Sequence, residues 1–232
     1  MHPEICKIGP VTVYSYGLML AVAFAVSAAL ALRAAKTKGI NPDTIFNFAF
    51  ISFVTGIIGA RIFYVAENIG YYIKNPLEII MLQRGGLSWF GGLILAIFTG
   101  IVYLKNKDLL VYKVLDLIAP FVALAQAIGR IGCLLNGCCF GKKPFPLPLQ
   151  IYSSLLLIFI FIVLRLLQER PHKDGQIFFT YLLLYSVKRF FIEFWRADNE
   201  IIFSGLTLFQ LISIAIFCLS IFKLAAIIRA KK

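Results

Sequence analysis

The stretch VLDLIAPFVALAQAIGRIGCLLNGCCFG, residues 114–141, decides the fold class and locates a candidate site. Its first part, Val114–Leu135, is long and apolar enough to cross the roughly 30 Å hydrocarbon core of a bilayer as a helix. Its end carries an arginine, an asparagine and three cysteines. Polar groups are costly at membrane depth, so their presence there calls for a structural or functional reason.

The composition is that of an integral membrane protein. The 232 residues are 60% hydrophobic and only 15% charged, and the mean hydropathy is +0.88. The net charge of +12 comes from short basic clusters between apolar runs, where lysine and arginine orient helices and meet anionic head groups. We therefore expect the lipid bilayer, and not a nucleic acid, to be the partner of these basic residues.

Seven apolar runs have the length of a spanning helix. They are Val11–Leu32, Pro42–Val65, Leu87–Leu104, Val114–Leu135, Leu149–Leu167, Gln176–Phe194 and Leu206–Ile228. We expect an all-α membrane protein, a polytopic bundle of about seven transmembrane helices in which residues 1–232 form a single integral membrane domain. More than half of the 23 basic residues fall on the side of the C-terminus, which predicts an outside N-terminus and a cytoplasmic C-terminus. Between the second and third runs, Leu77–Leu82 is too short to span and predicts a short helix at the outer surface.

Arg61, Asp116 and Arg130 are charged residues inside the second and fourth predicted spans. Arg130 is flanked by Gly129 and Gly132, which allow a ligand or a neighbouring backbone to approach closely. A guanidinium there suits a phosphate, because its fork donates two parallel hydrogen bonds. Arg61, near the outer end of the second span, either contributes to the same site or extends to the head groups. Asp116, at the start of a span, fits a structural role better than a catalytic one.

A second polar cluster lies on the sixth span. Tyr185, Arg189, Glu193 and Arg196 are spaced i, i+4, i+8 and i+11, so they share one helix face. Arg189 and Glu193 can form an ion pair, which is compatible with a structural contact or with a site. Two arginine-bearing faces in one bundle together predict an anionic ligand at the level of the lipid phosphates.

The cysteines allow several interpretations. Cys133, Cys138 and Cys139 are compatible with small apolar packing groups, with an external disulfide or, since Arg130 could activate a thiol, with a nucleophile. Their spacing matches zinc patterns only loosely, because zinc sites pair two-residue-spaced cysteines with a second pair or with histidines. We expect no metal and, without a dinucleotide or phosphate-loop glycine pattern, no cofactor.

Several motifs resemble one family. They are YSYGLML near the start, GARIFY, GGLSWFGGL, LDLIAP, GRIGCLLNGCCFG and YSVKRFFIEFWR, found in that order between about Ile8 and Arg196. This pattern resembles the bacterial prolipoprotein diacylglyceryl transferases. The resemblance implies a seven-span, multi-pass protein of the bacterial inner membrane with an outward N-terminus. It also implies an enzyme that transfers the diacylglyceryl group of phosphatidylglycerol to the lipobox cysteine of a prolipoprotein signal peptide, with release of glycerol phosphate.

The resemblance also assigns roles to residues. It implies that Arg130 grips the lipid phosphate and that Arg189 stabilises the leaving group or positions the substrate, with Tyr185 and Glu193 completing the catalytic set. The expected substrate-binding residues are Tyr16, Arg61, Gly91, Gly92, Gly129, Gly132, Asn136 and Gly137.

The chain departs from the family pattern at five polar positions. These are Phe90, Cys133, Cys138, Leu147 and Ser153. Phe90 stands where many members carry histidine, so the acceptor of the thiol proton stays open between Glu193, Tyr185 and Cys138. Two alternative functions also stay open: a related membrane transferase with another lipid or acceptor, and a non-enzymatic lipid-binding or transport protein.

Overall fold

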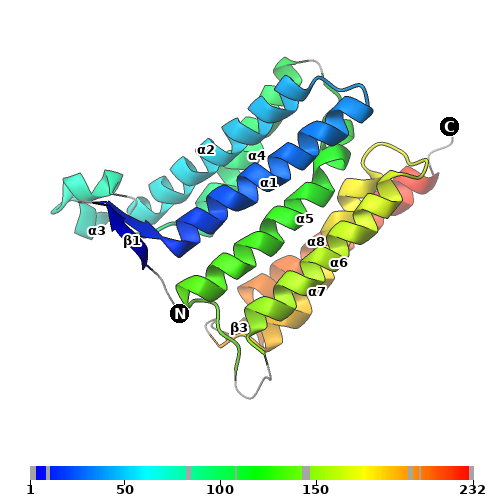
Figure 1. The fold of residues 1–232 in the computed structure, drawn as a ribbon. Coiled ribbons are helices and arrows are strands. Elements are labelled where there is room, and N and C mark those ends of the chain that lie inside the picture. Colours follow the sequence, from blue (N-terminus) through cyan, green and yellow to red (C-terminus); the bar gives the residue numbers. More distant parts are fainter. Residues whose placement is uncertain are drawn as a thin grey trace. The chain divides into compact units, whose positions relative to one another are not determined.

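The computed structural model describes residues 4–8, 11–81, 85–107, 109–142, 147–197, 201–203 and 205–229 (Figure 1). Helices make up most of the described chain. The elements are β1 (Glu4–Ile8), β2 (Val11–Tyr14), α1 (Ser15–Thr37), α2 (Pro42–Glu67), α3 (Ile69–Tyr72), η1 (Pro76–Ile80), α4 (Trp89–Asn106), α5 (Val111–Asn136), α6 (Leu149–Gln168), α7 (Gln176–Phe194), β3 (Ile201–Phe203), β4 (Leu206–Thr207) and α8 (Leu208–Arg229). They form two compact units, residues 32–111 and residues 1–31 with 112–232.

Six of the described helices are long and apolar enough to cross a membrane, which makes this a multi-pass membrane protein. They are α1, α2, α4, α5, α6 and α8. The sixth predicted run forms α7, but three of its 19 residues, Lys188, Arg189 and Glu193, are charged. The first predicted run began too early: Val11–Tyr14 pairs antiparallel with β1, and the helix starts at Ser15. The short helix predicted after α2 is present as the 3₁₀ helix η1, and its place at the outer surface stays a prediction.

Helix α5 contains a proline whose effect is compensated by α6. Pro120 has no N–H, so it cannot bond the carbonyl of Asp116 four residues earlier. The Gln168 side chain donates to that carbonyl at 2.8 Å, so the exposed acceptor is satisfied inside the protein. The Asp116 carboxylate in turn accepts from the backbone N–H groups of Gly175 (2.6 Å) and Phe178 (2.7 Å), at the start of α7. Asp116 is therefore structural, as predicted.

Small and branched apolar side chains pack α5, α6 and α7 together, and Figure 1 shows these helices side by side. The buried residues of this cluster are Ala119, Ala123, Ile160, Leu164, Ile177 and Tyr181. The packing fixes the helix ends that carry the polar residues of the candidate site.

In the unit of residues 32–111, α2 packs on α4 through glycines. A Cβ added to Gly91 would lie 2.4 Å from the Cβ of Phe63 and 2.5 Å from the carbonyl oxygen of Gly59, so only glycine permits this approach. The hydroxyls of Thr55 and Thr99 hydrogen-bond across the same contact at 2.8 Å.

Candidate functional site

The end of α5 is a glycine-capped turn. Gly137 has a φ of 75°, the left-handed conformation that closes many helices. Its N–H donates to the Leu134 carbonyl (3.3 Å), and the Cys138 N–H donates to the Cys133 carbonyl (3.1 Å). This is the Schellman arrangement, and it turns the chain so that Cys138 lies back over the helix that carries Cys133.

Backbone bonds join the segment after α5 to the segment after α7. Gly141 and Arg196 form an antiparallel bridge, the Lys142 N–H donates to the Trp195 carbonyl (2.8 Å), and the Ala197 N–H donates to the Phe140 carbonyl (3.1 Å). These bonds keep Cys138 and Cys139, which follow α5, close to Arg196, which follows α7.

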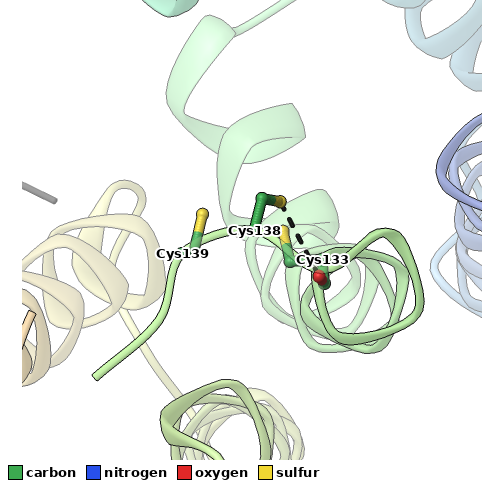
Figure 2. Close-up of side chains that lie close together, drawn as sticks. All are labelled: Cys133, Cys138 and Cys139. Carbon is green, nitrogen blue, oxygen red and sulfur yellow. Dashed lines mark hydrogen bonds between the residues drawn. The ribbon is translucent and has the colours of Figure 1, made fainter. Parts of the chain in front are cut away.

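Three thiols converge at this turn. The Sγ atoms of Cys133, Cys138 and Cys139 all lie within 4.8 Å of one another (Figure 2). Cys139 has a φ of 63°, a conformation that residues with a side chain rarely adopt. A hydrogen bond from Cys133, together with the guanidinium groups of Arg196 and Arg130, lowers the pKa of Cys139 to about 5, although burial opposes the shift. These surroundings favour the thiolate form of Cys139.

Arg130 faces this turn from α5, next to α1. It is half-buried, and its charge interacts with Cys139 and with Tyr16 at the start of α1. A Cβ on Gly132 would lie 3.0 Å from the Cβ of Met19, so this glycine is where α1 approaches α5. No described atom lies within 4 Å of a Cβ built on Gly129. The two glycines thus differ: Gly132 permits helix packing, whereas Gly129 leaves space beside Arg130.

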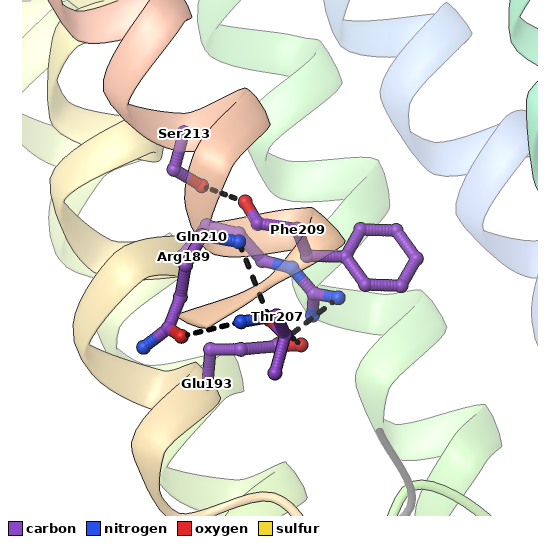
Figure 3. Close-up of polar contacts among 6 residues, drawn as sticks. All are labelled: Arg189, Glu193, Thr207, Phe209, Gln210 and Ser213. Carbon is purple, nitrogen blue, oxygen red and sulfur yellow. Dashed lines mark hydrogen bonds and ion pairs between the residues drawn. The ribbon is translucent and has the colours of Figure 1, made fainter. Parts of the chain in front are cut away.

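On α7, Arg189 and Glu193 form the ion pair that the sequence allowed. Their side chains meet at 3.2 Å and are 9% and 0% exposed. Thr207 donates to the second carboxylate oxygen at 3.0 Å, and the Arg189 guanidinium lies 4.4 Å from the ring centroid of Phe209 (Figure 3). Both oxygens of Glu193 therefore have partners.

A capping box at the start of α8 holds Thr207 in place. The Gln210 N–H donates to the Thr207 hydroxyl at 3.3 Å, and the Gln210 side chain accepts from the Thr207 N–H at 3.0 Å. Neither residue was predicted as part of the site. The sequence pattern that could have identified this capping box is T-x-x-Q before an apolar run.

Lys188 is a further residue that the sequence interpretation missed. Its side chain is buried, with the residue 6% exposed, and its amine has no hydrogen-bond partner among the described residues. The amine lies 5.5 Å from the ring centroid of Tyr185. Three arginines, at positions 130, 189 and 196, are close enough to act on its charge. The three guanidinium groups make this end of the bundle attractive to an anion, and the amine is a hydrogen-bond donor that such an anion could use.

Asn136 and Tyr185 complete the group. The Asn136 side chain hydrogen-bonds the Cys138 thiol, and Tyr185 packs against Tyr181 with ring centroids 5.9 Å apart. The structure therefore gathers most predicted site residues in one unit, around the ends of α5 and α7. They are Tyr16, Gly129, Arg130, Gly132, Asn136, Gly137, Tyr185, Arg189 and Glu193.

Arg61, Gly91 and Gly92 belong to the other unit. Arg61 is buried and does not extend outward: it donates to the carbonyls of Ile79 (2.8 Å), Gly85 (2.6 Å), Gly86 (2.9 Å), Glu78 and Met81. Gly92, like Gly91, lies in the contact with α2, where a Cβ would come 2.9 Å from the Gly56 carbonyl oxygen. All three have structural roles, and substrate contacts by them stay predictions.

A comparison with known protein families gives a match over nearly the whole chain. A family model described as prolipoprotein diacylglyceryl transferase matches residues 3–226. The chain belongs to this family. It is 34% identical to the phosphatidylglycerol–prolipoprotein diacylglyceryl transferase of Clostridium tetani over 96% of both chains. Proteins of the same name from Bacillus licheniformis (32% identity, 93% of this chain and 88% of the relative) and Streptococcus pyogenes (33%, 92% and 90%) are also similar.

The residues that depart from the expected family pattern have defined surroundings in the structure. Thiols stand at two positions of the predicted pattern, and all three cysteines of the turn are free in the structure. Ser153, another departure, is buried on α6, and its hydroxyl has no hydrogen-bond partner in the described part of the chain. In place of the expected histidine, α4 carries Phe90, which stacks edge-on against Trp89.

Proposed function

We propose that this protein transfers the diacylglyceryl group of phosphatidylglycerol to the lipobox cysteine thiol of a prolipoprotein, the first step of lipoprotein maturation in a bacterial cell membrane. The observation that carries the proposal is the cluster of three guanidinium groups, those of Arg130, Arg189 and Arg196, around the buried amine of Lys188. A concentration of guanidinium groups attracts an anion. The phosphate of phosphatidylglycerol is an anion of the right chemistry.

The reaction explains the need for cations. A sulfur nucleophile attacks the glycerol carbon, a C–S bond forms, and the C–O bond to phosphate breaks with its electron pair leaving on the phosphate. Negative charge therefore grows on the leaving group, and fixed cations stabilise that transition state. Arg130 acts as the bidentate phosphate ligand in this proposal, because it is only half-buried and has open space beside Gly129.

The other cations have supporting roles. Glu193 fixes the Arg189 side chain, and Lys188 offers an amine donor that has no other hydrogen-bond partner among the described residues. Because both Glu193 oxygens are engaged, Glu193 is a weaker candidate for the proton acceptor than Tyr185 or Cys138.

The topology belongs to the same proposal. We place α7 across the membrane with the six apolar helices, since the Arg189–Glu193 pair offsets two of its three charges. Seven spans in a single membrane domain, with the N-terminus outside and the C-terminus in the cytoplasm, put Arg130 and Arg189 toward the outer head groups. The lipobox peptide then reaches the site from the outer half of the bilayer.

The test is a transfer assay with purified protein in detergent, phosphatidylglycerol and a lipobox peptide. The peptide mass should increase by one diacylglyceryl group, and a peptide with serine in place of the lipobox cysteine should show no increase. If the protein is folded and the cysteine peptide stays unmodified, the proposed reaction is wrong and a different acceptor or lipid must be sought.

A further inference from the structure

We propose that Cys133, Cys138 and Cys139 form a three-thiolate site for a Zn²⁺ ion whose fourth position receives the substrate thiol. The three sulfur atoms already lie within 4.8 Å of one another at the end of α5 (Figure 2). Tetrahedral zinc with Zn–S bonds of about 2.3 Å holds its sulfur ligands about 3.8 Å apart, so small side-chain rotations suffice to close the site. The spacing along the chain matched zinc patterns only loosely, because it is the glycine-capped turn that brings the thiols together.

The turn is built as a rigid support for such a site. The backbone bond between the Cys138 N–H and the Cys133 carbonyl fixes two of the ligands, and Gln150 of α6 donates to the Cys138 carbonyl at 2.6 Å. Asn136 hydrogen-bonds the Cys138 sulfur, the kind of outer contact that orients a metal ligand. The left-handed φ of Cys139 directs the third ligand and is the sort of strain that marks a functional position.

The electrostatic surroundings suit an anionic metal complex. Three thiolates and one Zn²⁺ carry a net charge of −1, and a fourth thiolate would make it −2. Arg130 and Arg196, both close enough to act on Cys139, offset that charge. Thiolates select soft and borderline metals such as zinc over Mg²⁺ or Ca²⁺.

The site gives the proposed transfer a way to generate its nucleophile without a histidine at position 90. Three protein ligands and one open position are typical of catalytic zinc. The lipobox thiol displaces the water at the fourth position and releases its proton to water, because a zinc-bound thiol is deprotonated. The bound sulfur then attacks the glycerol carbon as the phosphate leaves with the C–O electron pair. Zinc stays Zn²⁺ throughout, and the neutral thioether product is a weaker ligand that water replaces.

This role rests on the proposed function, but the metal site is tested by itself. The reduced protein, purified in detergent, should contain about one zinc per chain by elemental analysis. After chelation, added Co²⁺ should produce the intense absorption of thiolate-to-cobalt charge transfer. The double variant Cys138→Ser/Cys139→Ser should lose at least about tenfold in metal affinity. Cys218→Ser is the matched control, because Cys218 is exposed on α8 and should leave metal content unchanged.

Transfer activity, measured on the same samples, separates the two proposals. We expect chelation of the wild-type protein to abolish transfer and added Zn²⁺ to restore it, a result that does not depend on the folding of any variant. Transfer that continues in zinc-free protein would overturn the inference and leave the proposed function intact. Zinc-free reduced protein that takes up no Co²⁺, or a double variant that binds Co²⁺ like the wild type, overturns it as well. A folded protein with one zinc and no transfer would contradict the proposed function instead.

Discussion

The buried ion pair of α7 allows a quantitative prediction. In the variant Glu193→Gln the side chain keeps its shape but loses its charge, so Arg189 is left with an uncompensated positive charge. The Glu193 side chain is 0% exposed and lies 3.2 Å from the guanidinium, so water cannot replace the lost partner. Breaking a buried pair in this way costs about 3–5 kcal/mol of stability.

A graded set of variants makes the reasoning testable. Thr207→Val removes only the 3.0 Å hydrogen bond to the carboxylate and the cap of α8, and should cost about 1 kcal/mol. The double variant Arg189→Met/Glu193→Gln should recover much of the loss, because no buried charge remains unpaired. Unfolding in mixed micelles with increasing denaturing detergent measures all three free energies. If the free energy of unfolding of Glu193→Gln lies within about 0.5 kcal/mol of the wild-type value, Glu193 does not form a buried ion pair with Arg189.

Three further predictions follow from individual contacts. Lys188→Met should lower transfer by roughly tenfold or more. The unfolding temperature should not fall, because the amine has no hydrogen-bond partner to lose among the described residues. Full transfer by this variant contradicts a role for Lys188. Gly91→Val should destabilise the protein by about 1–3 kcal/mol through the clash with Phe63, and a neutral effect in the same unfolding assay would mean that α2 and α4 pack less closely. In metal-free reduced protein, the rate of Cys139 alkylation by iodoacetamide should fall as the pH is lowered, with a midpoint near pH 5, because its pKa is lowered to about 5 and only the thiolate reacts. Peptide mass spectrometry measures the alkylation. A midpoint near pH 8 or above would show an ordinary thiol.

The helices were predictable because their signal is local. Apolar runs of spanning length locate the long helices, but the first and last runs begin too early. Val11–Tyr14 and Leu206–Thr207 are strands, whose pairing with β1 and β3 cannot be read from hydropathy. The Arg189–Glu193 pair was predictable for the same reason: both residues lie on one helix face, four positions apart.

Features that depend on distant segments were not predictable. Arg61 looked like a possible lipid contact, but its guanidinium binds carbonyls 17 to 25 residues further along the chain. Thr207 reaches Glu193 only through the packing of α8 on α7. The three thiols form one cluster because of a glycine turn, the conformation of which the spacing Cys133-x4-Cys138-Cys139 does not specify. Lys188 was not among the predicted site residues, because its burial is visible only in the folded bundle.

The central claim is that the guanidinium of Arg130 binds the lipid phosphate during diacylglyceryl transfer. The most direct test is the transfer assay on Arg130→Ala and Arg130→Lys, with each variant shown to be folded and monodisperse in detergent. We expect Arg130→Ala to lose transfer by at least about a hundredfold and Arg130→Lys to recover little, because a point charge lacks the two parallel donors. Transfer at the wild-type rate by Arg130→Ala would contradict the account.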